Sequence, residues 1–553
     1  MQTRVLKLDP KDNVLIALTA LRKGDEAGWQ GQTLVLASDV PAKHKFAAEE
    51  IAPGASVIMY GVLVGKAAQS IRAGEVLTTR NVRHEAAAFH EKSEEARWIP
   101  PDVSRWRART FLGYRRADGQ IGTRNYWLVV PLVFCENRNI RVLQQAFEEE
   151  LGFAAPSIYR RQVAEMVRLR EQGKTDEIRH RDAKEAAKEN AARPARQGVF
   201  GNLDGIKFLI HEGGCGGTRE DAESLCGLIA GYIHHPNVAG ATVLSLGCQH
   251  AQSATLREQI KLRDPNFSKP LLTFEQQGSG TEFAMLSEAV RQTFLGLVEA
   301  DERRRELAPL SALCAGLKCG GSDGFSGISA NPAVGHAADL LAALGGRTIL
   351  SEFPELCGVE QELINRCERK ETADRFIALM RDYAARAKAA RSGFDMNPSP
   401  GNIRDGLVTD AMKSAGAAKK GGTSPVTAVL DYPECARAPG LNLQCTPGSD
   451  VECVSAQTGA GANVILFTTG LGTPTGNPVA PVVKISTNSE LARRMPDIID
   501  VDTGGIISGE ASVEEMGEAI LDFVIRTASG EMRTKAELLG QNDFIPWKRG
   551  VSL

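Results

Sequence analysis

Short apolar runs separated by glycine turns dominate the first 90 residues of the chain. The runs VLIAL at 14–18 and TLVL at 33–36 lie between turns at Gly24, Gly54 and Gly74. Runs of this length bounded by glycine predict short β-strands. We therefore expect residues 1–90 to form a small β-rich domain.

From residue 111 the apolar runs become longer and alternate with helical patterns. The runs at 126–134, 206–210 and 241–246 predict buried strands, and the segment 221–233 predicts a helix. Strand, glycine turn, helix, strand is the order of a parallel βαβ sheet. We expect a first α/β domain over residues 111–307.

The same order of elements returns after residue 308. A helix is predicted at 513–528, near the end of this part. The grouping predicts a second α/β domain over residues 308–553, so the expected fold class is α/β behind a small β domain. Its strands are predicted at 315–319, 347–353, 426–430, 464–468 and 482–485.

Two polar segments interrupt this pattern. Residues 91–110 carry a Pro-Pro pair and no apolar period, so we interpret them as a linker. Residues 157–198 are highly charged and rich in helix formers. A charge run of this kind is typical of a solvated helical insertion, here in the first α/β domain.

Composition narrows the functional class. The 553 residues are too many for one core, and 65 basic against 68 acidic residues give a net charge of −3. The sequence has no basic block of the kind that binds nucleic acid, so we expect no nucleic-acid partner. The N-terminus lacks the apolar core of a signal peptide, and no run approaches the roughly 20 apolar residues that span a bilayer. We therefore expect a cytoplasmic protein with no membrane partner.

Cysteines follow four of the predicted strands, at Cys135, Cys215, Cys248 and Cys319. Ligands of open parallel sheets bind beyond the carboxyl ends of the strands. Thiolates gathered there could hold iron, zinc or an iron–sulfur cluster, although each cysteine could also be a small buried apolar residue. Taken together, Cys215, Cys248 and Cys319 favour a metal site, with His250 as a further ligand.

Three other residues are candidates for acid–base catalysis. His44 lies between two lysines in a polar turn of the small domain, where it could reach a neighbouring cleft as a base. His211 precedes the glycine turn around Cys215, and could also be a ligand. Glu352 lies at the end of the predicted strand at 347–353. A structural role remains open for each of them.

Two glycine-rich loops could cradle a carboxylate. The loop KCGGSDGFSG offers backbone N–H groups together with Ser322 and Asp323. The loop TTGLGTPTG at 468–476 could do the same, with Lys484, Thr487 and Asn488 close behind it. Neither loop is a P-loop, because no GK[ST] follows the glycines. Each could also be only a tight turn.

At these motifs the chain resembles the altronate and galactarate dehydratase family of sugar-acid hydro-lyases. The likeness covers nearly the whole chain, and the stretches SEFPEL and TNSELA and the ending GVSL favour its altronate branch. The motifs that carry it are HKFA, YRRADGQIGTRNY, HEGGCGG, LGCQH, KCGGSDGFSGISANPAVG, NPSPGN, FTTGLGTPTG and VKISTNSELA. The resemblance implies a small SAF-type domain at the N-terminus. It also implies an Fe²⁺- or Mn²⁺-dependent dehydration of a sugar acid to a 2-keto-3-deoxy acid.

The chain departs from the family pattern at the end of the small domain. A VHxHN motif becomes LTTRN, so Thr78 and Arg80 stand where the family has histidines. His44 is then the main candidate that the small domain offers to a metal or a substrate.

The resulting hypothesis is a metal-dependent dehydratase of an altronate-like hexonate, with His44 as acid–base group. The residues expected to hold the sugar acid are Arg124, Asn125, Ser322, Asp323, Lys484, Thr487 and Asn488. Alternatives are a galactarate-type dehydratase, a lyase that uses a [4Fe-4S] cluster or removes a group other than water, and a non-catalytic sugar-acid binding protein. A homodimer is expected.

Overall fold

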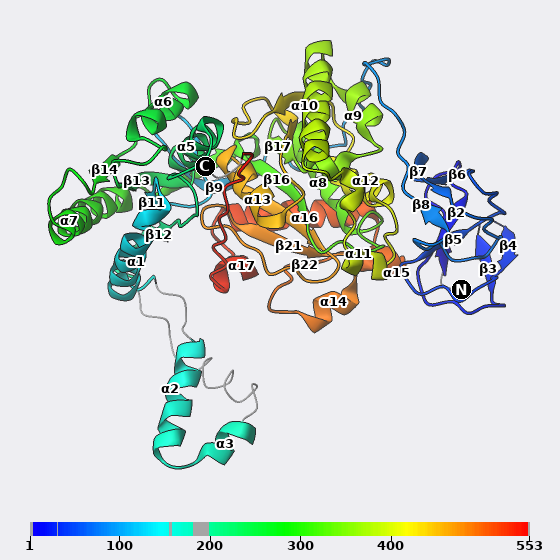
Figure 1. Ribbon diagram of the computed structural model, residues 1–553, viewed down its shortest axis with the longest axis horizontal. Helices are drawn as coiled ribbons and strands as arrows, with labels where there is room; N and C mark the ends of the chain where they lie inside the picture. The colour runs from blue at the N-terminus through cyan, green and yellow to red at the C-terminus, as the bar shows by residue number, and fades with distance from the viewer. Residues whose placement is uncertain (1–3, 30, 154–157, 181–197, 551–553) are drawn as a thin grey trace.

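The computed structural model describes residues 4–29, 31–153, 158–180 and 198–550. Three bodies lie in a row, with the small domain at one end and the four-stranded sheet at the other (Figure 1). The expected fold class, a small β domain followed by two parallel α/β domains, is confirmed. No helix within the described ranges is long and apolar enough to cross a membrane.

The small domain consists of short antiparallel strands around an apolar centre that includes Leu15, Val40 and Phe46. Glycines at positive φ turn the chain between its strands, as at Gly24 and Gly54. Its three sheets are β1 (Val5–Leu6), β2 (Val14–Ala17) and β5 (Lys45–Ala47); β3 (Glu26–Trp29) and β4 (Gln32–Val35); and β6 (Ser56–Met59), β7 (Val62–Ala67) and β8 (Val82–Arg83).

The first α/β domain is built on a parallel sheet in the order β12-β11-β13-β14. Its central strand, β11 (Tyr126–Pro131), is buried along its whole length, which explains its unbroken apolar sequence. The other strands are β12 (Gly205–Phe208), β13 (Val238–Ser245) and β14 (Leu271–Glu275), and the helices are α1 (Asn137–Leu151), α5 (Arg219–His234), α6 (Ser253–Arg263) and α7 (Glu282–Asp301).

A separate antiparallel sheet is formed by segments from the start and the end of this domain's sequence. It brings β9 (Thr110–Arg115) between β10 (Ile121–Gly122) and β15 (Arg305–Pro309). The charged insertion forms α2 (Ile158–Glu171) and α3 (Thr175–His180), which project from the body (Figure 1). Helix is therefore found over 158–171 and 175–180 of the predicted insertion 157–198; residues 172–174 and 198 are not helical, and residues 157 and 181–197 lie outside the described residues.

The second α/β domain holds a seven-stranded parallel sheet in the order β18-β19-β17-β16-β20-β21-β22. Its first strand, β16 (Cys314–Cys319), lies at the centre, and the chain later returns to its other side as β20 (Val464–Thr469). Strand order thus reverses between β16 and β20, which makes this pair the topological switch point where such sheets bind ligands.

The remaining strands extend the sheet on both sides, and helices cover its faces (Figure 1). The strands are β17 (Arg347–Leu350), β18 (Val426–Leu430), β19 (Gly440–Gln444), β21 (Val482–Ser486) and β22 (Val501–Asp502). The helices are α8 (Ala330–Ala343), α9 (Glu360–Arg366), α10 (Lys370–Ala389), α11 (Pro400–Arg404), α12 (Asp410–Ala418), α13 (Asp450–Gly459), α14 (Ser489–Arg494), α15 (Gly505–Ser508), α16 (Val513–Ala528) and α17 (Lys535–Leu538), with short 3₁₀ turns η1 (Phe134–Glu136), η2 (Leu310–Ala312), η3 (Phe353–Leu356), η4 (Phe394–Met396) and η5 (Lys419–Gly421).

The small domain is docked on the second α/β domain. One apolar core runs through both, since Val14, Ile16 and Val64 belong to the same buried cluster as Met412 and Ala415 of α12. Docking brings residues 43–45 of the small domain to the loops at the carboxyl edge of the seven-stranded sheet.

Candidate functional site

The loops that follow β16 and β20 meet at the switch point. The backbone N–H groups of Gly470 and Leu471 both donate to the carbonyl of Gly321, which takes a positive φ. A side chain at Gly470 would collide with Asp323. Glycine therefore allows these loops to pack closely around one carboxylate.

That carboxylate, Asp323, is fully buried and held from several directions. Thr487 Oγ1 donates to its Oδ2 at 3.0 Å, and Ser326 Oγ donates to Oδ1 at 3.1 Å. Asn488 Nδ2 lies 3.4 Å from Oδ2. Three of the predicted substrate-binding residues, Asp323, Thr487 and Asn488, are therefore brought together.

The small domain reaches the same point through residues 43–45. Lys43 Nζ lies 3.0 Å from Asp323 Oδ2 and 3.3 Å from Asp405 Oδ1. Burial opposes the charge on Lys43, but the two carboxylates outweigh it and raise the lysine pKa. A Cβ at Gly324 would lie 2.1 Å from the carbonyl oxygen of Lys43, so this approach requires glycine.

His44 and Lys45 continue this contact. Lys45 Nζ donates to the carbonyl of Gly406 at 2.8 Å, and burial lowers its pKa to about 7. His44 is half-buried, which lowers its pKa, and its Nδ1 lies 3.2 Å from the carbonyl of Ala42. Because a carbonyl only accepts, Nδ1 carries the proton in this contact and Nε2 keeps its lone pair.

A buried network of lysines and glutamates lies beside the switch point. Lys318 at the end of β16 pairs with Glu352, and Lys420 Nζ lies 3.4 Å from the other oxygen of that carboxylate. Burial, followed by the charge of Glu355, raises the pKa of Glu352. Lys413, 2.7 Å from Glu355, helps to hold the pKa of Glu355 at about 2 against its burial. Neighbouring carboxyls whose pKa values are driven apart are typical of acid–base sites.

Two residues of this region take strained backbone conformations. Lys43 has a φ of 75° and Glu352 a φ of 69°, both in the left-handed region that favours glycine. Such strain persists only where surrounding contacts impose it, and it is concentrated at active sites and ligand clamps.

The cysteines form a different group from the expected one. Cys135, Cys215 and Cys248 are exposed, and they follow the adjacent strands β11, β12 and β13. Burial, with the nearby Cys215 and Cys248, raises the pKa of Cys135, so these three sulfur atoms share one edge. Cys319 instead ends β16 of the other sheet, buried, with its Sγ 2.9 Å from Ser322 Oγ. Cys319 is separate from the other three cysteines because β16 is the first strand of the second parallel sheet.

The expected histidines of the first α/β domain take different positions. His211 is buried between two backbone groups: Gly213 N–H donates to its Nδ1 at 3.1 Å, and its Nε2 lies 2.8 Å from the carbonyl of Pro131. Burial lowers its pKa to about 4, so this ring is neutral and already hydrogen-bonded at both nitrogens. His250 is exposed two residues after Cys248, and its backbone N–H donates to the carbonyl of Gly214, next to Cys215.

Arg124 and Asn125 lie before β11, at the amino edge of its sheet. Arg124 forms two hydrogen bonds to Glu537, at 2.7 and 3.0 Å, and Asn125 Nδ2 donates to the carbonyls of Asn202 and Ala300. Lys484 is buried in β21 and donates to Gln541. Burial lowers its pKa to about 8. The structure therefore places Arg124 and Asn125 away from the loop cluster around Asp323. Lys484 lies closer to it: its ammonium is 5.3 Å from the centre of the Phe467 ring, but no contact joins it to Asp323.

The structure also contains a group of potential metal ligands that the sequence did not predict. His84, Cys357 and Asp410 place one ligand atom each within 4.8 Å of one another. His84 Nδ1 and Asp410 Oδ2 are both buried without a hydrogen-bond partner. Imidazole, thiol and carboxylate are ligand types that fit the divalent iron that the family resemblance implies. These three residues are too far apart in the sequence to form a recognisable metal-binding motif. Only His84 is close to a motif of the family, because it follows shortly after LTTRN.

A second described group of potential ligands fits a metal less well. Asp118, His234 and Asp264 also lie within 4.8 Å of one another. However, His234 Nε2 is 3.0 Å from Gln120, and the buried ammonium of Lys269 donates to the carbonyl of His234. A cation therefore already occupies this neighbourhood.

Comparisons with known proteins identify the family. Three family models match in succession: the altronate/galactarate dehydratase SAF domain over residues 3–85, the second domain of D-galactarate dehydratase/altronate hydrolase over 113–301, and the C-terminal D-galactarate/altronate dehydratase domain over 310–552. The chain belongs to the altronate/galactarate dehydratase family. The expectation of an enzyme of the hydro-lyase class is thereby confirmed.

Individual relatives match over the full length. The chain is 34% identical to the altronate dehydratase of Escherichia coli (strain K12) over 554 residues and 33% identical to that of Bacillus subtilis (strain 168) over 551, in both cases 99% of each chain. It is 30% identical over 444 residues to the (2R)-sulfolactate sulfo-lyase subunit beta of Chromohalobacter salexigens, which covers 79% of this chain and 97% of that one.

Proposed function

We propose that this protein dehydrates an altronate-like hexonate to a 2-keto-3-deoxy acid, at the carboxyl edge of the seven-stranded sheet. The observation that carries the proposal is the contact of Lys43 with Asp323 at the switch point, because it brings His44 of the small domain to that edge. The likeness to two altronate dehydratases over 99% of the chain supports the choice of substrate.

The reaction removes a proton beside a carboxylate and expels hydroxide from the next carbon. His44 suits the first step, because a neutral ring with a free Nε2 lone pair is a base. We assign to Glu352, whose pKa is raised by burial and by the charge of Glu355, the donation of its own proton to the leaving hydroxyl; the proton that His44 took from carbon then restores Glu352 through solvent, and Lys318 and Lys420 pair with the carboxylate in between. The enol then becomes the 2-keto-3-deoxy acid, so carbon and proton counts balance with one water released.

Ser322, Asp323, Thr487 and Asn488 surround the same edge and supply hydroxyl, carboxylate and amide groups. Such groups hydrogen-bond the hydroxyls of a sugar acid, while the ammonium of Lys43 favours its carboxylate. A divalent iron or manganese ion, when bound, would stabilise the enolate charge by acting as a Lewis acid. His84, Cys357 and Asp410 are the described residues that fit such an ion.

The test is an anaerobic assay for 2-keto-3-deoxy acid over a panel of hexonates and hexarates, with Fe²⁺ or Mn²⁺ supplied. We expect product from altronate, and at least a hundredfold loss of turnover in His44→Ala, because positioned acid–base catalysis contributes about 10²- to 10⁴-fold. The matched control is His90→Ala, which alters an exposed histidine just before the linker. Normal turnover in His44→Ala would remove this residue from the mechanism, and ligand binding without product would favour a sugar-acid binding protein.

A cluster-dependent lyase is the second candidate, and the three exposed cysteines at the other sheet favour it. Three thiolates can hold a [4Fe-4S] cluster and leave one iron open to substrate. The named sulfo-lyase relative adds sulfo-acids to the substrate panel. Acid-labile sulfide equal to iron, lost in Cys215→Ser, would support this candidate, whereas iron without sulfide would exclude it.

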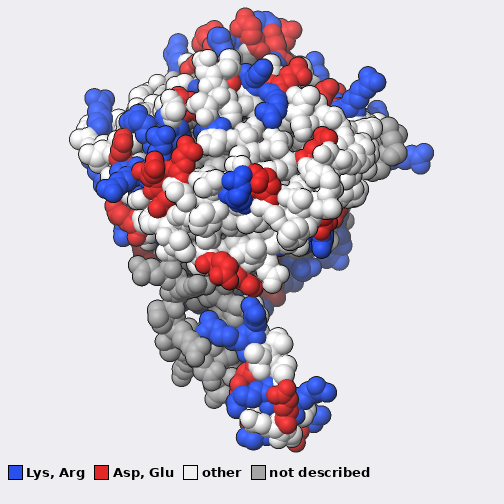
Figure 2. All heavy atoms as spheres, turned by 90° about the vertical axis from the view of Figure 1, so that its left-hand side faces the viewer, with Lys and Arg blue, Asp and Glu red and all other residues white. Residues whose placement is uncertain are grey.

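We further propose a cytoplasmic homodimer. Helix α7 exposes large apolar side chains, including Phe283, Phe294 and Leu295. Figure 2 looks onto this side of the molecule and shows a broad face with few charged groups. Large apolar side chains exposed on one helix are typical of protein interfaces.

A further inference from the structure

One cluster of metal-ligating side chains lies at the junction between the small domain and the second α/β domain. His84 leaves the small domain just after β8, Cys357 follows η3, and Asp410 is the first residue of α12. Three segments far apart in sequence thus bring an imidazole nitrogen, a sulfur and a carboxylate oxygen within 4.8 Å of one another.

Two of these ligand atoms are unsatisfied. Asp410 is fully buried, and its Oδ2 has no hydrogen-bond partner of good geometry; Oδ1 lies 3.5 Å from Ser414 Oγ, and the Cys357 thiol also interacts with this carboxylate. His84 Nδ1 is also buried without a partner. Buried polar atoms of folded proteins are normally hydrogen-bonded, so two unpaired atoms within one cluster of ligand-type side chains point to a group that these residues can bind.

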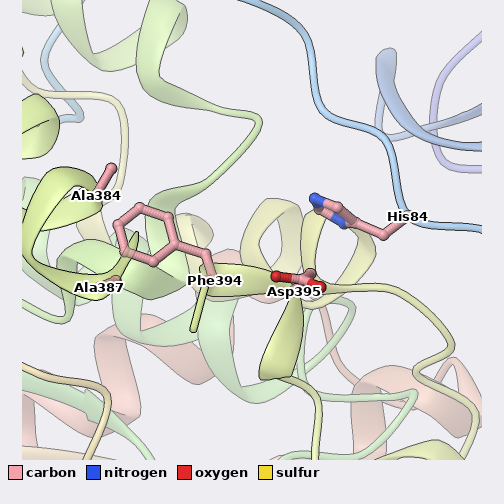
Figure 3. A pocket seen from close by; sticks show the side chains of 6 residues that line it. His84, Ala384, Ala387, Phe394 and Asp395 are labelled. Carbon is pink, nitrogen blue, oxygen red and sulfur yellow. The ribbon is translucent and has the colours of Figure 1, made fainter. Parts of the chain in front are cut away.

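A cavity opens beside the imidazole. It has a volume of about 440 Å³ and is lined by His84, Ala384, Ala387, Gly393, Phe394 and Asp395. Figure 3 shows His84 projecting from the chain that leaves the small domain toward the segment that carries Phe394 and Asp395. This volume is in the range of small-molecule sites, roughly 300–1,000 Å³, and its polar lining residues are His84 and Asp395.

We propose that His84, Cys357 and Asp410 bind one divalent cation of borderline softness, Fe²⁺ or Zn²⁺. A mixed nitrogen, sulfur and oxygen set selects such ions over Mg²⁺ or Ca²⁺, which prefer oxygen alone. Three protein ligands leave positions free, as in catalytic metal sites, and the cavity beside His84 offers room for an oxygen ligand there. That this ligand is a sugar acid rests on the proposed function. The metal site itself does not.

The test uses the full-length protein, stripped of metal and titrated with Co²⁺ as a spectroscopic probe under anaerobic conditions. We expect one equivalent of Co²⁺ and a thiolate-to-cobalt charge-transfer band that disappears in Cys357→Ser. His84→Ala and Asp410→Asn should each weaken Fe²⁺ or Zn²⁺ binding by at least about tenfold, as measured by competition with a chelator. Because His84 is only half-buried, His84→Ala keeps the test valid if the other variants do not fold.

Matched controls are Cys435→Ser, a partly buried cysteine whose Sγ lies 3.4 Å from the Ala460 carbonyl, and His90→Ala. Both should bind Co²⁺ as the unaltered protein does. A charge-transfer band that survives Cys357→Ser, or stoichiometric metal lost only when Cys135, Cys215 or Cys248 is replaced, would overturn the inference. Metal bound through Cys357 with no keto-acid product would refute the proposed function and leave the site intact.

Discussion

Replacing Lys43 with methionine tests how the small domain contributes to the switch point. The ammonium lies 3.0 Å from Asp323, whose side chain is fully buried, while the lysine side chain is 21% exposed. Breaking a buried ion pair costs about 3–5 kcal/mol, and exposed pairs contribute about 0–1 kcal/mol. Because Lys43 retains some solvent contact and Asp323 keeps its hydrogen bonds to Thr487 and Ser326, we expect a loss of about 2–3 kcal/mol.

This loss should be local. The apolar core shared by the two domains does not depend on Lys43, so the small domain remains docked and only the loop 43–45 opens more readily. Hydrogen–deuterium exchange of peptides covering this loop should then be roughly 30- to 150-fold faster, since each 1.4 kcal/mol corresponds to a factor of ten. Turnover should fall together with loop closure, because His44 is displaced.

Two variants separate this explanation from a general loss of stability. Lys23→Met replaces a lysine whose side chain is exposed in the same domain and should leave both exchange and turnover unchanged. Lys43→Met combined with Asp323→Asn removes both charges and should recover part of the lost protection, because no buried carboxylate is left unpaired. Unchanged exchange in residues 43–45 of Lys43→Met would refute the reasoning.

Three further predictions concern the first α/β domain. Burial lowers the pKa of His211 from 6.5 to about 4, so on acidification the unfolded chain takes up this proton before the folded chain does. The stability that neutral His211 contributes is complete above pH 6.5 and is lost as the pH falls to 4, on the order of 3 kcal/mol. The thermal unfolding of His211→Gln should lack this part of the pH dependence. Cys248→Ser should leave turnover and bound iron unchanged if the metal lies at His84, whereas parallel loss of iron and sulfide would favour the cluster-dependent lyase. Leu295→Glu places a charge on the apolar surface of α7 and should convert a dimer to monomers in light scattering, and an unchanged mass would exclude this face.

The sequence was sufficient to predict the order of elements but not the identity of the sheets. Buried strands such as β11 and β20 have continuous apolar runs, and glycine turns follow them, so βαβ units could be recognised locally. Which strands share a sheet depends on long-range packing. For that reason the sequence predicts a group of Cys215, Cys248 and Cys319, although Cys135, and not Cys319, is the third cysteine on the sheet of Cys215 and Cys248.

Long-range packing also explains why only part of the predicted site comes together in the structure. The glycine loop with Ser322 and Asp323 and the TTGLGTPTG loop meet, because both follow neighbouring strands of one parallel sheet. Arg124 and Asn125 precede their strand, so their position at the amino edge could have been inferred from chain direction alone. His84, Cys357 and Asp410 come together only through docking of the small domain, which no local pattern encodes.

The small domain thus supplies Lys43 to the switch point and His84 to the candidate metal site, and the two contributions can be separated. Apparent metal affinity scales with the fraction of molecules in which the domain is docked. Because the shared core keeps that fraction near one, Lys43→Met should slow turnover while leaving Co²⁺ affinity unchanged within about twofold. An equal loss of affinity and turnover would mean that the Lys43–Asp323 pair, rather than the apolar core, holds the domain in place.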